Sequence, residues 1–270
     1  MKIKDFLREH LTISYFVIAF LISWGGSILG GGKNFVQGKI PELIDILPMG
    51  IAMLLGPSFS GIVLTYIDNG RKGINYLFKR MKKWKINVRW YGATLIFPIL
   101  ILIILMPLSV LVTKELAPTF FPIGILIGLF AGFIEETGWM GFVYPKLRLR
   151  HGILRASIHL GILHAFWHIV ADFLGNYRDF GTIWFLYFIS FTVFIVALRI
   201  IIVWVYEKTK SLFLAQLMHA SSSGFLSVFV PTGIAGQSWF VFYAVYAIAL
   251  WVIASLIINR NRGPFLKLPA

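Results

Sequence analysis

The sequence predicts an all-α, polytopic membrane protein whose eight helices cross a lipid bilayer. Three observations support this fold class. Of the 270 residues, 58% are hydrophobic and only 13% are charged, and the mean hydropathy is +0.82. Soluble domains typically carry about 25% charged residues, so this composition indicates helices that face lipid.

Apolar windows of about 20 residues, the length that crosses the hydrocarbon core, recur along the whole chain. They are 12–31, 45–67, 91–113, 122–147, 151–174, 183–206, 212–230 and 238–258. Pro57 and Pro107 are expected to kink the second and third spans. The longest polar interval, 68–90, is too short to bury a core of its own. We therefore expect one integral-membrane domain over 1–270, with its core motifs in 122–230.

The net charge of +14 follows membrane topology and does not form a nucleic-acid-binding region. Cations concentrate before the first span, after the second, fourth and sixth spans, and in the tail. The other intervals hold only Lys33, Lys39, Lys114 and Arg178, and Arg199 stands inside the sixth span. The positive-inside rule then predicts cytoplasmic N- and C-termini, as an even number of spans requires. The lysine- and isoleucine-rich composition favours a prokaryotic plasma membrane.

The basic segment 79–89 mixes cations with aromatic side chains such as Trp84. This pattern is typical of an amphipathic segment that lies against anionic lipid headgroups. The bilayer is therefore the partner that we expect for this segment, and no nucleic acid is expected.

Two adjacent glutamates, Glu135 and Glu136, stand inside the fourth predicted span. An ionisable side chain at membrane depth costs about 2.5 kcal/mol or more, so such residues mark functional sites that face the bundle interior. Adjacent helical residues point about 100° apart. We expect one glutamate to enter a central pocket and the other to hold a neighbouring helix, while Gly132, Gly138 and Gly141 allow close helix approach. The alternative is a pair of protonated acids that only join helices.

His164, His168 and Asp172 recur every four residues in the fifth predicted span and so share one helix face. Two imidazoles at this spacing can hold one metal ion, as in zinc sites, and a carboxylate one turn further on can orient an imidazole. The alternative for Asp172 is an interfacial hydrogen-bond network. The chain has no cysteine, which excludes disulfides, thiolate ligands and a cysteine nucleophile.

His219 lies in the seventh predicted span, and Ser223 follows it by one helical turn. The hydroxyl of Ser223 could donate to an oxyanion, or the residue could simply allow close helix packing. Carboxylates and imidazoles that converge from three spans would equip an intramembrane hydrolase. The predicted catalytic residues are Glu135, Glu136, His168, His219 and Ser223. The sequence requires no particular cofactor; the candidate metal is zinc, and its candidate ligands are Glu135, His164, His168 and His219.

Three stretches of the sequence resemble the motifs of the CPBP family, the CAAX proteases and bacteriocin-processing enzymes also called Abi proteins. They are EETGWMG at 135–141 with 145–147, then 166–168, and finally 204–206 with Thr209 and Ser211 leading to His219. The resemblance implies a CAAX-protease-like bundle of eight helices with an intramembrane cavity. It also implies that the first-motif glutamate and second-motif histidine activate water, while the third-motif histidine and a following asparagine stabilise the oxyanion.

Three positions depart from the family pattern. Met140 stands in place of an arginine, His164 in place of an aromatic residue, and Ser223 in place of an asparagine. Losing the arginine removes an i,i+4 ion pair to Glu136. We hypothesise that His164 either restores the missing positive charge or completes the metal site.

The predicted activity is hydrolysis of a peptide bond in a membrane-associated substrate, prenylated or leader-bearing. Glu135 would act as general base with His168, and His219 and Ser223 would face the oxyanion. These residues suit catalytic zinc and metal-free acid–base catalysis alike. The alternative is a catalytically impaired member of the same family that acts in bacteriocin self-immunity or regulation. A proton-coupled transporter would also use buried Glu and His, but no inverted repeat is visible.

Overall fold

The structure, a computed structural model, describes residues 3–39 and 43–267, and these residues form helices and short connections without any strand. The α-helices are α1 (Ile3–Glu9), α2 (Leu11–Val36), α3 (Leu43–Met81), α4 (Ile96–Leu111), α5 (Ile123–Gly138), α6 (Tyr144–Phe180), α7 (Ile183–Thr209), α8 (Leu212–Phe229), α9 (Gly236–Arg260) and α10 (Arg262–Leu266). Two 3-10 helices, Val88–Leu95 and Lys114–Leu116, flank α4, and a π-helical turn, Trp139–Val143, joins α5 to α6. The all-α membrane fold class is confirmed.

Within the described residues, seven helical stretches are long and apolar enough to cross a membrane, whereas the sequence predicted eight. The difference lies in one stretch, Ile123–Phe180, which has 58 residues. At 1.5 Å per residue a straight helix of this length would be about three times as long as the hydrocarbon core is thick. The stretch bends at Gly152, whose φ of 75° and ψ of 179° are accessible mainly to glycine. Divided at this bend, it supplies the fourth and fifth predicted spans.

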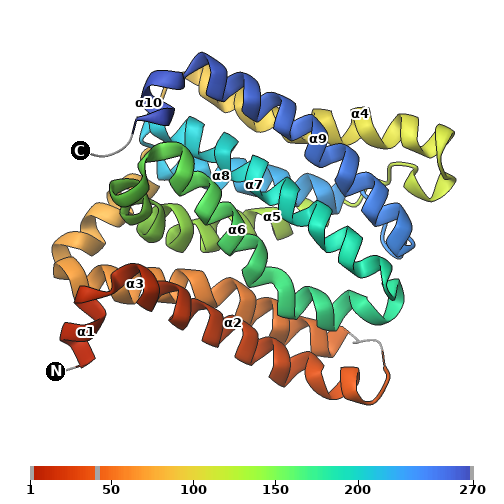
Figure 1. The fold of residues 1–270 in the computed structure, drawn as a ribbon, viewed down its shortest axis with the longest axis horizontal. Helices are drawn as coiled ribbons and strands as arrows, with labels where there is room; N and C mark the ends of the chain where they lie inside the picture. Colours follow the sequence, from red (N-terminus) through yellow and green to blue (C-terminus); the bar gives the residue numbers. More distant parts are fainter. Residues whose placement is uncertain (1–2, 40–42, 268–270) are drawn as a thin grey trace.

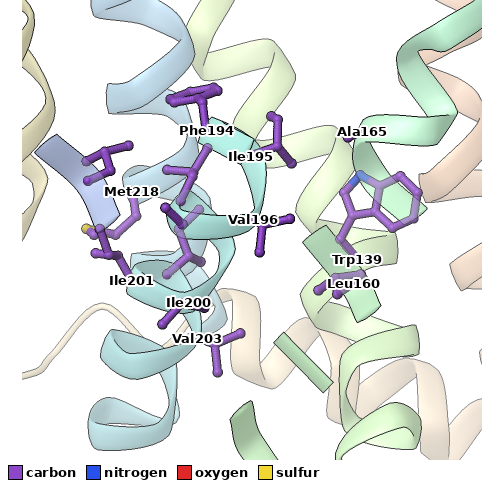
Figure 2. Packing of buried hydrophobic residues seen from close by; sticks show 14 of the residues in the cluster. Trp139, Leu160, Ala165, Phe194, Ile195, Val196, Ile200, Ile201, Val203 and Met218 are labelled. Carbon is purple, nitrogen blue, oxygen red and sulfur yellow. The ribbon is translucent and has the colours of Figure 1, made fainter. Parts of the chain in front are cut away.

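Helix α7 is the central helix of the bundle. Figure 1 shows α2 and α3 paired along one side and α9 with α4 along the opposite side, with α5 to α8 between them. Over residues 194–203 the side chains of α7 are buried on all faces, as expected of a helix enclosed by others, whereas Phe185 and Ile189 in its first half are exposed. In Figure 2, residues of α7 such as Ile200 and Ile201 pack toward Met218 of α8, and Val196 packs toward α6. The neighbours of α7 carry the rest of the site.

The basic intervals meet at one end of the bundle, which we call the basic end. There, Lys146 bonds Asp68 at 2.8 Å, and Arg148 lies 2.9 Å from Glu207. Lys83 donates to the carbonyl of Thr209 at 2.8 Å. Helices α1 and α10 lie at this same end (Figure 1), as an even number of crossings requires.

Glycines allow α5 to pack closely against α8. Gly124, Gly128 and Gly132 recur every four residues and face the α8 backbone; a Cβ at Gly124 would lie 2.7 Å from the Val228 nitrogen. Gly138 similarly faces the backbone of Pro57 in α3. The expected close approach at Gly132 and Gly138 is confirmed, and it fixes the helix that carries both glutamates.

Replacing Gly128 with alanine should loosen this contact. The new methyl group would overlap the backbone of Ala220 and Gly224 in α8, so we expect a loss of about 1–3 kcal/mol in the free energy of unfolding. Thermal unfolding in detergent measures this loss. The matched control is Gly175→Ala in α6, where nothing lies within 4 Å of the added Cβ, and stability should hold or rise slightly because alanine favours helix. Equal losses in both variants would contradict a tight contact between α5 and α8.

Candidate active site

The candidate site forms where α5 runs into the π-helical turn Trp139–Val143. Single π-helical turns occur frequently at functional sites. Gln216 of α8 donates to the Phe133 carbonyl at 2.9 Å and so fixes α8 beside the end of α5. Helices α6, α7 and α8 each contribute polar side chains at this level of the bundle.

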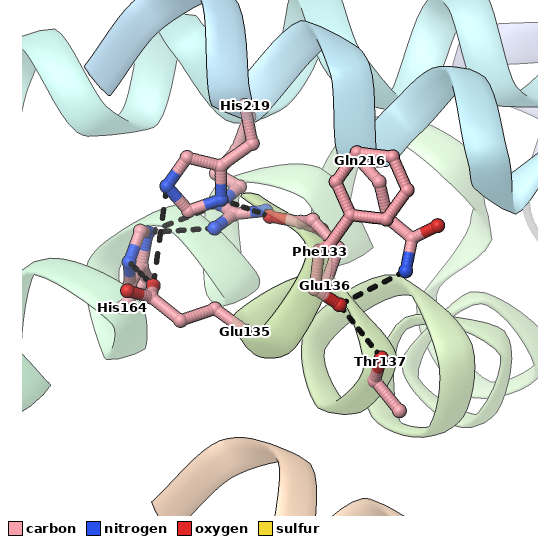
Figure 3. A network of polar contacts seen from close by, with 8 residues as sticks. Phe133, Glu135, Glu136, Thr137, His164, Gln216 and His219 are labelled. Carbon is pink, nitrogen blue, oxygen red and sulfur yellow. Dashed lines mark hydrogen bonds and ion pairs between the residues drawn. The ribbon is translucent and has the colours of Figure 1, made fainter. Parts of the chain in front are cut away.

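The two glutamates point apart, as their spacing predicted. Glu136 accepts a hydrogen bond from Arg199 of α7, and both side chains are 0% exposed. The same carboxylate oxygen lies 2.6 Å from Nδ1 of His219 in α8. Figure 3 shows Glu135 directed instead toward His164. Glu136 therefore joins three helices, and Glu135 is the glutamate that enters the pocket.

Glu135 lies between two imidazoles. Its Oε2 atom is 3.5 Å from Nε2 of His164 and 3.9 Å from Nε2 of His219. All three side chains are buried. One carboxylate oxygen and two ring nitrogens thus face a common small volume.

Arg199 of α7 is a site residue for which the sequence predicts no role. Its Nε and Nη2 atoms lie 3.1 and 3.0 Å from Nδ1 of His164. A guanidinium group only donates hydrogen bonds, so Nδ1 accepts and the ring proton lies on Nε2, toward Glu135. The hypothesis that His164 replaces the missing positive charge is therefore wrong, because Arg199 supplies that charge. A lone arginine in an apolar span was the available signal.

His168 lies in the same cavity but not against the carboxylate. Its ring packs edge to face on Phe191, with ring centroids 5.3 Å apart, and against Trp167. In the described part of the chain, no hydrogen bond or ion pair joins it to Glu135. The structure places His164 beside Glu135, so the catalytic role of His168 stays a prediction.

Asp172 has an interfacial role. Its carboxylate accepts hydrogen bonds from Nε1 of Trp184 at 2.7 Å and from the hydroxyl of Tyr187 at 2.8 Å. Both donors belong to α7, so Asp172 fastens the outer part of α6 to α7. The prediction that Asp172 orients an imidazole is therefore wrong, and the alternative of an interfacial hydrogen-bond network is correct.

A cavity of about 450 Å³ unites most of the predicted residues, and its volume lies in the range of small-molecule sites. It is lined by Glu135, His164, His168, His219 and Ser223. Glu136 is the one predicted catalytic residue behind the cavity wall rather than in it. The remaining lining is mostly apolar and aromatic.

The predicted zinc ligands do not form a metal site in this arrangement. Among the described residues, no group of three or more His, Asp or Glu side chains is arranged to hold a metal ion. Nδ1 of His164 is engaged by Arg199, and a buried guanidinium so close to the cavity opposes a second cation there. The set Glu135, His164, His168 and His219 thus does not fit preformed zinc ligation.

Comparison with known proteins supports the motif assignment. The family model described as type II CAAX prenyl endopeptidase Rce1-like matches residues 117–225. This segment includes both glutamates, the cavity histidines and Arg199. A comparison with curated proteins gives no match. The resemblance predicted from the three motifs is confirmed over residues 117–225, a segment that is similar to type II CAAX prenyl endopeptidases.

Proposed function

We propose that this protein is an intramembrane endopeptidase that hydrolyses a peptide bond in a membrane-associated substrate, prenylated or leader-bearing. One observation carries the proposal. Oε2 of Glu135 and Nε2 of His164 lie 3.5 Å apart on the wall of the cavity, and both are buried without a closer hydrogen-bond partner within the described chain. Because buried polar atoms are nearly always paired, these two are suited to hold water and substrate in the cavity.

The reaction uses Glu135 as general base. Its carboxylate takes a proton from a water molecule, and the hydroxide attacks the carbonyl carbon of the scissile bond. His164 holds the carboxylate from the other side through Nε2–H, and His168, on the same cavity, shares in the proton transfer. Glu135 then returns the proton to the leaving amine, which completes hydrolysis with water as the only co-reactant.

The oxyanion is stabilised from α8. His219 is anchored to Glu136 through Nδ1, so its Nε2 faces the cavity. Because the carboxylate accepts at Nδ1, Nε2 donates to the oxyanion in the form of the ring that carries a proton on both nitrogens. Ser223, one turn further along α8, lines the same cavity. Donors fixed before the reaction starts lower the barrier most when they face the developing charge in a site with little water.

The compensation at Glu136 favours an active enzyme over an impaired self-immunity or regulatory protein. Met140 leaves Glu136 without the arginine of the family motif, but Arg199 pairs with the same carboxylate from α7. The electrostatic partner is thus retained although its position in the sequence has changed. The pair also fixes His164 and His219 beside the cavity, through hydrogen-bond contacts to the same guanidinium and the same carboxylate.

We also propose a multi-pass location in a prokaryotic plasma membrane, with both termini in the cytoplasm. The clustering of basic intervals at one end of the bundle supports this orientation, because lysines and arginines concentrate on the cytoplasmic side. The exposed cations and aromatic residues of 79–89 at that end suit anionic headgroups.

Glu135→Gln should abolish peptide hydrolysis while the protein stays folded. Removing a general base typically costs about 10²–10⁴-fold in rate. The measurement is mass spectrometry of peptides released from membranes that contain the wild-type chain or the variant. Ser255→Ala on α9, remote from the cavity, is the control. Identical peptide profiles with and without the Glu135 carboxylate would favour the regulatory alternative.

Arg199→Leu should destabilise the fold because it leaves Glu136 buried without its ion-pair partner, a loss of about 3–5 kcal/mol. The double variant Glu136→Leu/Arg199→Leu should be less destabilised than Arg199→Leu alone, since neither charge remains. Adding Met140→Arg to Arg199→Leu should also recover stability, because position 140 lies one turn from Glu136. Thermal unfolding in detergent measures the stability of all three variants. If Arg199→Leu alone were as stable as the wild type, the structural role of the pair would be refuted.

His164→Phe should lower hydrolysis without changing metal content. The variant loses the Nε2–H group beside Glu135 but keeps an aromatic ring in its place. Elemental analysis of the purified protein should give no stoichiometric zinc before or after the substitution, and chelators should leave wild-type activity unchanged. One zinc ion per chain that disappears in His164→Phe would instead establish the metal site.

A further inference from the structure

The cavity extends from the site toward the end of the bundle opposite the basic end. Beyond the site residues, its lining includes Phe121 just before α5, 230–232 just after α8, and Trp239 in the first turn of α9. These segments lie where α5 and α9 begin and α8 ends, away from α1 and α10 (Figure 1). Phe121 is 46% exposed, and Thr232 is exposed as well. The cavity therefore has its mouth at the end that is poor in lysine and arginine.

The opposite side of the site is closed. Trp139 and Trp167 are fully buried, with ring centroids 5.6 Å apart. Trp139 also packs against the ring of His164, at 5.2 Å between centroids. Trp139 follows Glu135 along the chain toward the basic end, and together with the buried pair of Glu136 and Arg199 it forms a floor on that side of Glu135. Water or peptide from that end would have to pass through packed core.

One wall of the cavity carries a polar stripe. His219, Ser223 and Ser227 recur every four residues on α8, and Thr232 continues the line to the mouth. An extended peptide inside a membrane must find hydrogen-bond partners for its backbone. Hydroxyl groups spaced along one wall can supply them, whereas Phe194 and Tyr243 on the other helices favour apolar substrate side chains.

The cavity also reaches a side of α5 where apolar side chains are exposed. Ile127 of α5 lines the cavity and is 48% exposed, and Ala131 lines it one turn deeper. Helix α5 packs mainly on α8 and α3, whereas α6 packs mainly on α7 and α2, so the two helices diverge beyond their π-helical junction. An opening beside α5 would let a chain move from lipid into the site.

We infer that the substrate enters from the end opposite the basic loops, as an apolar, extended segment held in that half of the bilayer. By the positive-inside rule this is the extracytoplasmic half. That a substrate uses this route rests on the proposed function. The route itself is inferred from the cavity alone. A soluble tail presented from the cytoplasm would meet the closed floor instead.

The chain has no cysteine, so single cysteines can test the route directly. We would place them at Thr232 and Ser227 along the polar wall, at exposed Lys82 on the basic end, and at fully buried Ser157. Intact cells are treated with a membrane-impermeant maleimide, and labelling is compared before and after permeabilisation. We expect Thr232→Cys and Ser227→Cys to label in intact cells, Lys82→Cys only after permeabilisation, and Ser157→Cys in neither case. Labelling of Ser227→Cys only from the cytoplasmic side would overturn the inference.

A second measurement separates this inference from the proposed function. Ser227→Cys should label equally well when combined with Glu135→Gln, because access does not need catalysis. Labelled Ser227→Cys should lose peptide release, since the adduct blocks the route. If peptide release depends on Glu135 but survives the adduct, the route is wrong and the endopeptidase stands. If labelling follows the expected pattern but no peptide release depends on Glu135, the route stands and the endopeptidase proposal fails.

Discussion

The buried pair of Glu136 and Arg199 is the constraint on which the site depends. An unpaired charge at this depth would cost several kcal/mol, so α5 and α7 are held in the one register that joins the two side chains. His164 accepts from the same guanidinium, and Nδ1 of His219 contacts the same carboxylate oxygen. Four helices are thereby fixed at one level, and the positions of the cavity residues follow from that registration.

This pair also explains two departures from the family motif. Met140 is fully buried and apolar, which is consistent with a carboxylate that already has its cation from α7. At position 164 a histidine can accept a hydrogen bond from that cation, whereas a hydrocarbon ring would leave guanidinium protons unpaired. The residues at 140, 164 and 199 therefore form one consistent set. Ser223 lies outside it, on the cavity wall, where its hydroxyl group can still donate.

Features that arise within one helix could be predicted from the sequence. Features that depend on how each helix is rotated about its axis relative to its neighbours could not. Apolar window length gave the membrane fold, and the 100° step between Glu135 and Glu136 gave their separate roles. Spacing alone could not decide whether His164 or His168 meets Glu135, because both lie on one stripe. Arg199 is 63 residues from Glu136, and the uniformly apolar sequence of α7 does not indicate which way the arginine points. The predicted spans 122–147 and 151–174 placed a boundary close to Gly152, where the backbone bends, but the sequence did not show that one nearly continuous helical stretch, Ile123–Phe180, carries both.

In a hydrolase inside a membrane, water must be excluded from the buried ion pair but must reach the general base. Here the two carboxylates belong to adjacent residues, Glu136 and Glu135. Water around Glu136 and Arg199 would raise the local dielectric and weaken the attraction that registers the helices. Water around Glu135 is the reactant. Trp139, in the turn that follows both glutamates, meets both needs because its ring closes the floor and packs against His164. Because the glutamates are one residue apart, the Glu135 carboxylate faces the cavity and the Glu136 carboxylate lies in packed protein. The ring of Trp139 helps to separate these two environments.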